Sequence, residues 1–557
     1  MGGLARRVEF LVSVPCVIFE DDHLLAVNKP PGMNTHAPGP FAGEGIYDWL
    51  RHREPRWARL AIMHRLDKET SGVIVFSKTE LANRSLTEQF TRRSIRKKYL
   101  LLTDRVVRRK EFAAKSALVR AGEKYVARPA HAGGEQAETR FRVVCSSPGE
   151  TLVEAEPLTG RTHQIRVHAA ANGFPVLGDT RYGGTPAARV HLHAQELILK
   201  HPATGEEMTL TAPVDFAGDT LLVLRSALID VRETNAYRLV HGAADGWPGW
   251  HVDRLGDFLL SQSAQPLTDK QRETLAGWLK LFSLRGAYHK LLAKRVHKSS
   301  VAQASPRKVL GSDAAEEYIV RENGVRFALS FIEGYSVGLF LDQRDNRRRF
   351  LTGDVAAGFS LLTNVRRESR LSGLKENRRD ACPTMEVLNT FAYTCGFSVC
   401  AAKAGARTIN LDLSAKYLDW ARRNFTLNGL DHAAHDFVHG DVFDWLGRFA
   451  KKKRTFDVIV LDPPTFSQSK EHGAFQAEKD YGELVAAALP VLKADGVLFA
   501  STNAAKLSAE KFLEMVTAAI GSARRRILRQ YYAPQPPDFP VNRAEPAYLK
   551  TLWVTMK

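Results

Sequence analysis

The stretch His64-Arg65-Leu66-Asp67-Lys68-Glu69-Thr70-Ser71-Gly72 places one carboxylate in a short polar turn, directly before the apolar residues 73–76. A four-residue apolar run with β-branched side chains is typical of a strand buried on both faces. The pattern therefore predicts that Asp67 is held at the rim of a rigid sheet rather than on a mobile loop. An Asp near Ser and Gly also forms turns, so a purely turn-forming Asp67 is the alternative interpretation.

The length and charge of the chain restrict what kind of protein it is. Its 557 residues are too many for a single core and indicate roughly three or four domains. No apolar run reaches the ~18 residues that a membrane helix needs, and no signal pattern is visible, so a cytoplasmic location is expected. The net charge of +18 suits a polyanionic partner such as RNA, although a merely basic, soluble surface would give the same composition.

The five cysteines do not form a recognisable metal or disulfide pattern. They form no CxxC pair and have no histidine nearby at the spacing of zinc ligands. We therefore predict scattered reduced thiols and no metal site at Cys16, Cys145, Cys382, Cys395 and Cys400.

Several motifs of the first 222 residues resemble the RluA family of RNA pseudouridine synthases. Besides residues 64–72, these are the stretches 25–32 (LAVNKPPG), 97–100 (KKYL), 160–168 (GRTHQIRVH) and 178–183 (GDTRYG). The resemblance implies a mixed antiparallel-sheet domain over residues 1–222 that isomerises uridine in RNA, with no metal or redox cofactor. It also implies that Asp67 acts on the nucleotide as nucleophile or as base, which the resemblance leaves open.

The same resemblance assigns three further residues to this site. Arg166 would form an ion pair that keeps Asp67 ionised, because a buried carboxylate without a cation would have a raised pKa. Tyr99 would stack on the flipped uracil, and Arg65 would fill the space that the nucleotide leaves. The alternatives are a strand-surface arginine at 166 and a simple core tyrosine at 99.

Two basic stretches have open interpretations. Arg92, Arg93, Arg96, Lys97 and Lys98 precede Tyr99 and either contact phosphates or form a solvated face. Residues 366–383 carry six basic side chains with little apolar periodicity, which indicates an exposed basic loop that either touches RNA or is a solvated insertion.

The last third of the chain alternates expected strands and helices, the pattern of a parallel α/β sheet. Asn389, Phe391 and Tyr393 lie in an expected turn after a strand, and Asp412 ends the next strand about twenty residues later. A carboxylate at that position accepts hydrogen bonds from ribose hydroxyls in mononucleotide-binding folds. The turn lacks the common GxGxG, and Asp412 could instead cap a helix, a role for which Ser414 competes.

Residues 224–557 resemble the RlmI/RlmK-type ribosomal RNA methyltransferases. The similar stretches include 389–394 (NTFAYT), 417–424 (YLDWARRN), 462–470 (DPPTFSQSK), 340–344 (FLDQR) and 245–254 (DGWPGWHVDR). The resemblance implies a small α+β central domain over 223–345, a Rossmann-like class I domain over 346–557, and S-adenosyl-L-methionine as cofactor. It implies that Asn389, Phe391, Tyr393, Asp412, Asp441 and Asp462 contact this cofactor, with Asp441 at the adenine.

The atom to be methylated is the next question. Methylation at carbon 5 of cytosine needs a cysteine thiolate, which cytosine-modifying relatives carry in a Ser-Cys-Ser stretch; here that place reads Ser501-Thr502-Asn503. Asp462, Pro463 and Pro464 can instead orient an exocyclic amine or a ring nitrogen. We therefore expect methylation of a guanine nitrogen, at position 7 or at the exocyclic amine. The side chain of Cys395, where relatives carry glycine, is expected to crowd the cofactor.

Together these patterns predict a multidomain α+β and α/β enzyme with two activities, a pseudouridine synthase fused to a methyltransferase, both acting on structured RNA such as large-subunit ribosomal RNA. One alternative is a cytosine carbon-5 methyltransferase in the C-terminal half. Another is an RNA-binding ribosome-assembly factor in which one site is inactive.

Overall fold

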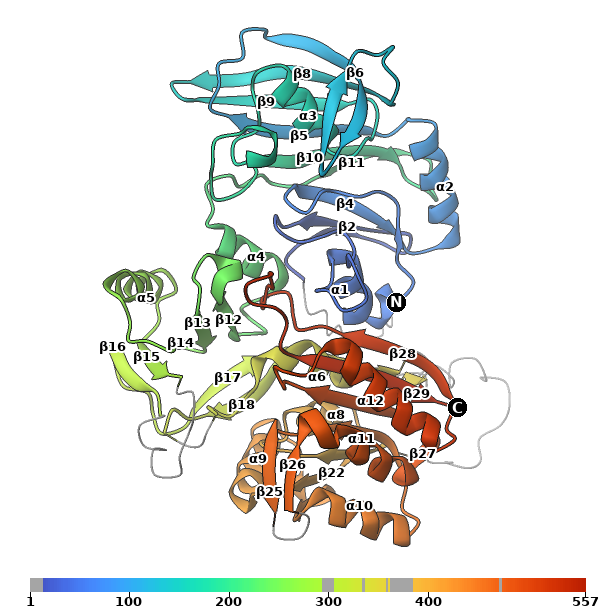
Figure 1. The fold of residues 1–557 in the computed structure, drawn as a ribbon, viewed down its shortest axis with the longest axis vertical. Coiled ribbons are helices and arrows are strands. Elements are labelled where there is room, and N and C mark those ends of the chain that lie inside the picture. The colour runs from blue at the N-terminus through green and yellow to red at the C-terminus, as the bar shows by residue number, and fades with distance from the viewer. Residues whose placement is uncertain (1–13, 293–304, 333–335, 357–358, 361–383, 470–472) are drawn as a thin grey trace, which may run out of the picture. The chain divides into compact units, whose positions relative to one another are not determined.

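The computed structural model describes residues 14–292, 305–332, 336–356, 359–360, 384–469 and 473–557. These residues form two compact units, the first running to Val231 and the second from Arg232 to Lys557, with Gly39–Gly43 and His52–Pro55 grouped with the second (Figure 1). The expected basic loop at 366–383 and Cys382 lie outside the described residues. The division into domains 1–222, 223–345 and 346–557 stays a prediction.

The first unit is built on one large, mainly antiparallel sheet, as expected. Its strand order is β1-β2-β4-β10-β5-β9-β8-β6-β7, with β11 beside β10 and β3 beside β4. The strands are β1 (Val17–Glu20), β2 (Leu24–Lys29), β3 (Ala61–Ile62), β4 (Ser71–Ser77), β5 (Arg96–Thr103), β6 (Glu111–Ala121), β7 (Lys124–Arg128), β8 (Glu135–Ser147), β9 (Glu150–Pro157), β10 (Leu192–Lys200) and β11 (Glu207–Thr211). The helices are α1 (Ile46–Arg53), α2 (Glu80–Thr91), α3 (Gln164–Ala171) and α4 (Thr220–Leu228).

Strand β4 follows the Asp67 turn and is buried along its whole length, which confirms the expectation drawn from residues 73–76. It pairs in parallel with β10 through Ser71 and Gly72. A Cβ atom at Gly72 would lie 2.2 Å from the carbonyl oxygen of Ala194, and the φ of Gly72 is +115°. Only glycine therefore allows the two strands to meet directly after the turn that carries Asp67.

The second unit begins with a sheet of the order β12-β13-β14-β15-β16 and a separate hairpin β17-β18. These strands are β12 (Ala236–His241), β13 (Trp250–Leu255), β14 (Phe258–Ser263), β15 (Gly286–Leu291), β16 (Arg307–Gly311), β17 (Tyr318–Glu322) and β18 (Val325–Leu329). Helix α5 (Asp269–Leu281) lies between β14 and β15 in the chain. It starts with a capping box formed by Thr268 and Gln271.

A seven-stranded sheet forms the rest of the second unit, in the order β23-β22-β21-β24-β27-β29-β28. The first five strands pair in parallel, and β29 runs antiparallel to its two neighbours, β27 and β28. The elements are α6 (Arg344–Thr352), β19 (Asp354–Ala356), β20 (Phe359–Ser360), β21 (Glu386–Thr390), α8 (Gly396–Lys403), β22 (Arg407–Asp412), α9 (Ala415–Leu427), β23 (Asp436–His439), α10 (Val442–Lys451), β24 (Phe456–Leu461), β25 (Phe466–Ser469), β26 (Gly473–Gln476), α11 (Ala477–Ala488), β27 (Leu492–Thr502), α12 (Ala509–Ser522), β28 (Ile527–Ala533) and β29 (Lys550–Met556).

Helices cover both faces of this sheet, as the alternation of its side chains requires. Val458 and Val460 of β24 pack in one core with α6, α8 and α9, whereas Ile459 and Leu461 pack in another with α10, α11 and α12 (Figure 1). The strand order reverses between β21 and β24. In open α/β sheets, ligands bind at the carboxyl ends of the strands at such a reversal.

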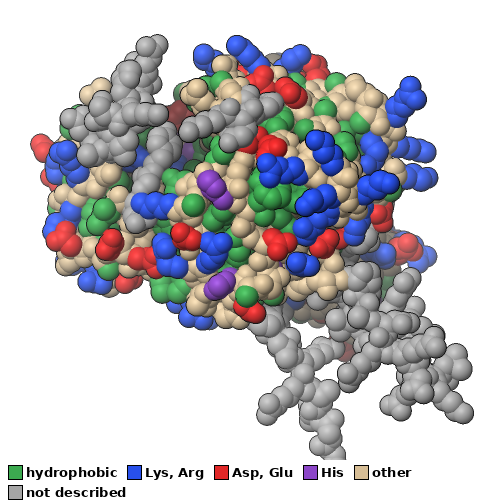
Figure 2. All heavy atoms as spheres, turned by 90° about the horizontal axis from the view of Figure 1, so that it is seen from below, with side chains coloured by type: hydrophobic (Ala, Val, Ile, Leu, Met, Phe, Trp, Pro, Cys, Tyr) green, Lys and Arg blue, Asp and Glu red, His purple; other side chains and the backbone are tan. Residues whose placement is uncertain are grey.

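Charged side chains of both signs are distributed over the surface. On the face shown in Figure 2, Lys and Arg side chains lie among Asp and Glu side chains. None of the helices in the described parts of the chain is long and apolar enough to cross a membrane.

Candidate active sites

The turn that carries Asp67 is held at the edge of the large sheet by its neighbours. The backbone N–H of Thr70 donates to the carbonyl oxygen of Asp67 at 3.1 Å and closes the turn. The hydroxyl of Thr35 donates to the carbonyl oxygen of Leu66 at 2.9 Å and accepts from its N–H at 3.1 Å. Two hydrogen bonds to the residue before Asp67 therefore limit how far the carboxylate can move.

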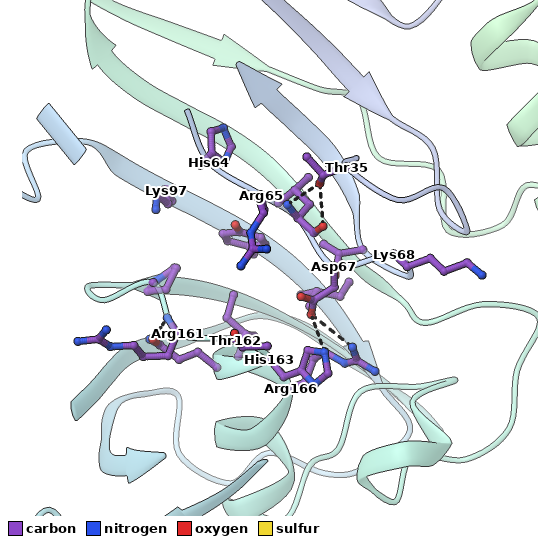
Figure 3. A pocket seen from close by; sticks show the side chains of 18 of the residues that line it. Thr35, His64, Arg65, Asp67, Lys68, Lys97, Arg161, Thr162, His163 and Arg166 are labelled. Atoms are coloured by element: carbon purple, nitrogen blue, oxygen red, sulfur yellow. Dashed lines mark hydrogen bonds and ion pairs between the residues drawn. The ribbon is translucent and has the colours of Figure 1, made fainter. Parts of the chain in front are cut away.

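Arg166 is the cation that faces this carboxylate. It lies on α3 rather than on a strand and its side chain is only 3% exposed, which excludes a strand-surface arginine. Its guanidinium donates to both oxygens of Asp179, at 2.6 and 2.8 Å, and its Nη1 lies 3.3 Å from Asp67 Oδ2 and 3.3 Å from Glu69 Oε2 (Figure 3). Burial alone would lower the pKa of Arg166, but Asp179, Asp67 and Glu69 together raise it above its ordinary value.

Tyr99 and Arg65 line the same cavity as Asp67 and Arg166. The volume of this cavity is about 910 Å³. Tyr99 lies on β5 and packs partly against the core that also holds Phe141 and Ile165. Burial, and to a lesser degree the charge of Asp67, raise the pKa of Tyr99, so its hydroxyl stays protonated. Arg65 is exposed at the rim. The structure thus brings together all four residues that the sequence placed in this site.

The basic stretch before Tyr99 divides into two groups. Arg93 and Lys97 line the cavity. Arg92, Arg96 and Lys98 form ion pairs instead, at 2.7 Å with Glu88, 3.3 Å with Glu207 and 2.9 Å with Glu196. Contact of Arg93 and Lys97 with phosphates therefore stays a prediction, and the other three side chains are accounted for by their ion pairs.

Lys29 supports the Asp67 turn from outside the cavity, a role that the sequence motifs did not reveal. Its side chain is fully buried, and its ammonium donates to the carbonyl oxygens of Pro30, Met33 and Lys68 at 3.0, 2.7 and 3.2 Å. Burial lowers its pKa to about 7, against the opposing charges of Asp67 and Glu69. The only signal in the sequence was its position directly before two prolines.

A second cavity of about 280 Å³ lies at the strand-order reversal of the seven-stranded sheet. It is lined by predicted site residues from three loops, namely Phe391, Tyr393, Asp412, Asp462, Pro463 and Pro464. These loops follow β21, β22 and β24, whose carboxyl ends meet at the same edge. The structure therefore brings these six predicted residues together at one edge of the sheet.

The loop after β21 has an unusual backbone. Phe391, Tyr393 and Cys395 have φ values of 53°, 50° and 62°, in the left-handed region that favours glycine. These alternating positions correspond in spacing to a GxGxG loop, so the backbone keeps that shape with larger residues. Each such residue costs of order 1–2 kcal/mol, a strain that surrounding structure must offset. The hydroxyl of Thr394 helps by donating to the carbonyl oxygen of Gly338 at 2.6 Å.

Asp412 ends β22 and braces this loop. Its Oδ2 accepts from the N–H of Tyr393 and its Oδ1 from the N–H of Ser414, both at 2.8 Å. Ser414, not Asp412, caps helix α9, because its hydroxyl accepts from the N–H of Tyr417. Burial raises the pKa of Asp412, while the two backbone hydrogen bonds lower it.

Asp462 follows β24 and has neutral partners. The amide of Gln343 donates to its two oxygens at 3.3 Å each, and also to the hydroxyl of Ser501 at 2.7 Å. Burial, with a further contribution from the charge of Asp342, raises the pKa of Asp462 to about 6. Gln343 and Asp342 belong to the FLDQR stretch, whose role here the sequence did not reveal.

Two predicted cofactor residues do not line this cavity. Asn389 is buried and its side-chain amide donates to the hydroxyl of Ser398 at 2.7 Å. Asp441 caps helix α10 and accepts from the N–H groups of Phe443 and Asp444 at 2.9 and 3.2 Å. The side chains of Asn389 and Asp441 therefore form hydrogen bonds within the fold rather than in the cavity.

The cysteines near the second cavity are poorly suited to act as nucleophiles. Cys395 and Cys400 are buried in the core between the sheet and α8, and neither lines the cavity. Burial raises the pKa of both thiols, that of Cys400 to about 12. The expectation that Cys395 crowds a cofactor does not follow from this geometry, because its side chain enters the core. Among the described residues, no group of His, Cys, Asp or Glu side chains could hold a metal ion.

Comparisons with known proteins match each unit separately. Residues 23–171 match the family model described as RNA pseudouridylate synthase, and residues 373–554 match the model described as S-adenosylmethionine-dependent methyltransferase. Over 351 residues the chain is 32% identical to a ribosomal RNA large subunit methyltransferase of Deinococcus radiodurans, covering 61% of this chain and 78% of that protein. Over 238 residues it is 38% identical to ribosomal large subunit pseudouridine synthase C of Salmonella typhimurium, covering 40% of this chain and 73% of that protein.

Proposed function

The chain belongs to the RNA pseudouridylate synthase family through its N-terminal part and to the S-adenosylmethionine-dependent methyltransferase family through its C-terminal part, and we propose that it performs both reactions on large-subunit ribosomal RNA. The first site converts specific uridines to pseudouridine, and the second transfers a methyl group to a base. The observation that supports this most directly is the buried ion pair of Arg166 with Asp67 in a large cavity that Tyr99 also lines.

Isomerisation requires that the glycosidic bond break, that the uracil turn, and that a bond to carbon form again. Asp67 is the group that acts on the nucleotide, as nucleophile or base, and Arg166 keeps it ionised while the nucleotide excludes water. Tyr99 provides an aromatic face for the extruded uracil, and Arg65 at the rim fills the gap that the base leaves in its RNA. Arg93 and Lys97 contact the phosphates, which orients the RNA without reading its sequence.

The second cavity fits S-adenosyl-L-methionine by the chemistry of its lining. Its volume of about 280 Å³ is near the lower end of the roughly 300–1,000 Å³ range of small-molecule sites. Asp412 accepts hydrogen bonds from the ribose hydroxyls, and Phe391 and Tyr393 provide apolar contact. When bound, the cofactor supplies an electrophilic methyl group. Asp441, which caps α10, remains our proposal for contact with the adenine.

The methyl acceptor that we propose is a nitrogen of guanine, at position 7 or at the exocyclic amine. Asp462, with Pro463 and Pro464, orients the base at the cavity. Methylation of carbon 5 of cytosine needs a thiolate that adds to the ring, and no cysteine among the described residues lines this cavity. The guanine assignment rests on that chemistry and on the carboxylate of Asp462.

Both activities can be tested on one RNA. The protein is incubated with large-subunit ribosomal RNA that carries tritium at carbon 5 of uridine, in the presence of S-adenosyl-L-methionine. Release of tritium measures isomerisation, and mass spectrometry of the digested RNA identifies the methylated nucleoside. Methylguanosine supports the proposal, whereas 5-methylcytidine would refute the choice of acceptor while leaving the methyltransferase activity in place.

A ribosome-assembly factor with an inactive site is the remaining alternative. Titration calorimetry with S-adenosyl-L-methionine separates the two, because an inactive clamp has no need to bind the cofactor. An Asp412→Ala variant is the matched control for heat that does not come from the second cavity.

A further inference from the structure

His163 has a strained backbone that a structural role in its helix does not explain. It precedes α3 with φ 57° and ψ 17°, a left-handed conformation, and its side chain makes no capping hydrogen bond. Such a conformation is uncommon for a residue with a Cβ and persists where the surroundings enforce it, often at functional sites. The side chain is 14% exposed and lines the cavity that contains Asp67. The strain therefore serves to aim the imidazole into the first site.

A chain of hydrogen bonds determines which ring nitrogen carries the proton. The N–H of Tyr125 donates to the hydroxyl oxygen of Tyr182 at 3.1 Å, and that hydroxyl lies 2.8 Å from Nδ1 of His163. Because the phenol oxygen already accepts a hydrogen bond, its own proton is available to donate to Nδ1. The neutral ring then carries its proton on Nε2.

The opposite side of the ring faces Asp67. Nε2 of His163 lies 3.9 Å from Oδ2 of Asp67, the oxygen that also approaches Nη1 of Arg166 (Figure 3). A negative oxygen on this side also favours a proton on Nε2. Oδ1 of Asp67 has no hydrogen bond or ion pair with a described residue, so Arg166 and His163 both approach the same oxygen, Oδ2.

The charge state of His163 follows from the groups around its ring. Burial lowers its pKa; Asp67 and Glu69 raise it, and Arg166 and Arg181 lower it again. The rings of Tyr125 and Tyr182 pack edge-on against it, with centroids at 5.9 and 5.7 Å. The net direction is downward, so His163 is neutral at physiological pH and acts as a donor, not as a second cation.

We propose that Tyr182 locks His163 in its Nε2–H tautomer and that His163 is a positioning residue, which with Arg166 holds Oδ2 of Asp67 and leaves Oδ1 to react with the uridine. This inference rests on the proposed isomerase activity of the first site. It adds an assignment of the reacting oxygen and a role for two residues, His163 and Tyr182.

The main test compares two substitutions of His163 in the full chain. His163→Ala removes the Nε2–H that faces Oδ2 of Asp67 at 3.9 Å, a separation too long for a full hydrogen bond, and is expected to lower kcat for tritium release roughly 3- to 10-fold, with KM changed little. His163→Gln places an amide N–H at a similar reach and is expected to restore most of kcat. Equal losses in both variants, or a kcat for His163→Ala within twofold of wild type, would overturn the inference.

Tyr182→Phe tests the tautomer lock, because a purely structural role does not predict a change in pH profile. Without the hydroxyl, the neutral ring loses the hydrogen bond to Nδ1, whereas Asp67 and Glu69 still favour the charged ring, so the pKa of His163 rises. A charged His163 would pair with Oδ2 as a second cation and make Asp67 a weaker nucleophile or base, so the acid limb of kcat should move to higher pH, with a loss of roughly 2- to 10-fold near neutrality. An unchanged acid limb would contradict the lock.

Two controls separate this inference from its premise. Methylation by the second site, measured on the same samples, reports whether each variant is folded. If wild-type protein releases no tritium, the proposed isomerase function fails. If wild-type protein is active and His163→Ala is equally active, only the role of His163 fails.

Discussion

Asp67 in the first cavity and Asp462 in the second differ in the side chains that contact their carboxylates. Asp67 faces the buried guanidinium of Arg166, which is itself anchored by Asp179. Asp462 is held by the neutral amide of Gln343 and lies near a second carboxylate, Asp342, so that its pKa is raised to about 6. The same residue type is therefore paired with a buried guanidinium in one unit and has a carboxyl with a raised pKa in the other.

This difference agrees with the chemistry proposed for each site. A group that attacks or deprotonates a nucleotide must stay ionised when the substrate excludes water, and a fixed cation ensures this. A group that only orients a base for methyl transfer needs a hydrogen-bond acceptor, and a weakly stabilised carboxylate is sufficient. Substitutions of the two aspartates, and of the side chains that contact them, test whether the two carboxylates differ in this way.

Removing the carboxylate of the first site should have the largest effect. Asp67→Asn preserves shape and leaves Arg166 with Asp179 and Glu69, so the fold should be retained. We expect tritium release to fall roughly 10⁴-fold or more, as for other residues that act directly on substrate. Methylation of the same RNA should remain within a few-fold of wild type. A tritium release near that of wild type would show that Asp67 is a turn residue only.

Removing the guanidinium of Arg166 should lower the stability of the fold as well as the isomerase activity. Arg166→Leu leaves Asp179 buried without its partner, which typically costs about 3–5 kcal/mol of unfolding free energy. The double variant Arg166→Leu/Asp179→Leu removes both charges and should recover most of that stability, but not isomerisation. Denaturant unfolding of the three proteins measures the effect. Recovered activity in the double variant would argue against the role of the guanidinium at Asp67.

The sequence could predict those parts of both sites that lie in continuous motifs. The strand after Asp67, the two strand ends near residues 390 and 412, and the acid that follows β24 all come from local patterns of apolar runs and turns. The pairing of Arg166 with Asp67, 99 residues apart, came only from family resemblance.

Contacts between distant segments could not be predicted from these patterns. The amide of Gln343 reaches Asp462 across 119 residues, and Lys29 reaches the carbonyl of Lys68 across 39. The direction in which a side chain points could not be predicted either, because Asn389 faces Ser398 in the interior rather than the cavity. Residue type misled at Cys395, because a left-handed backbone turns its side chain into the core.

The pH dependence of the second site should be measurable. Because burial raises the pKa of Asp462 to about 6, its ionised form is fully populated only above that pH. If the carboxylate accepts a hydrogen bond from the base, methylation should rise through pH 6 and level off above pH 7. Asp462→Asn should lower the plateau roughly 100-fold and remove this rise.

Stability provides a second measurement on the same variant. An acid whose pKa is higher in the folded than in the unfolded protein contributes stability at low pH that is lost as pH rises through the folded pKa. Asp462→Asn removes this loss, so its melting temperature at pH 7.5 should exceed that of wild type. A variant that is less stable than wild type would contradict this, because it would mean that hydrogen bonds and charges around Asp462 stabilise its ionised form by more than burial destabilises it.

The smallest effect is expected at Cys395, where the sequence alone indicated a clash with the cofactor. The thiol is buried in the core and does not line the cavity, so Cys395→Gly should change the affinity for S-adenosyl-L-methionine less than about threefold, or about 0.7 kcal/mol. Relief of the left-handed strain and loss of the buried thiol have opposite effects on stability, of about 1 kcal/mol each.

Asp412→Ala is the matched comparison, because it removes both the proposed ribose contact and the hydrogen bond to the N–H of Tyr393, and should weaken binding at least tenfold. Tighter binding by Cys395→Gly, measured by calorimetry, would show that the side chain does restrict the cavity and that the loop moves when the cofactor binds.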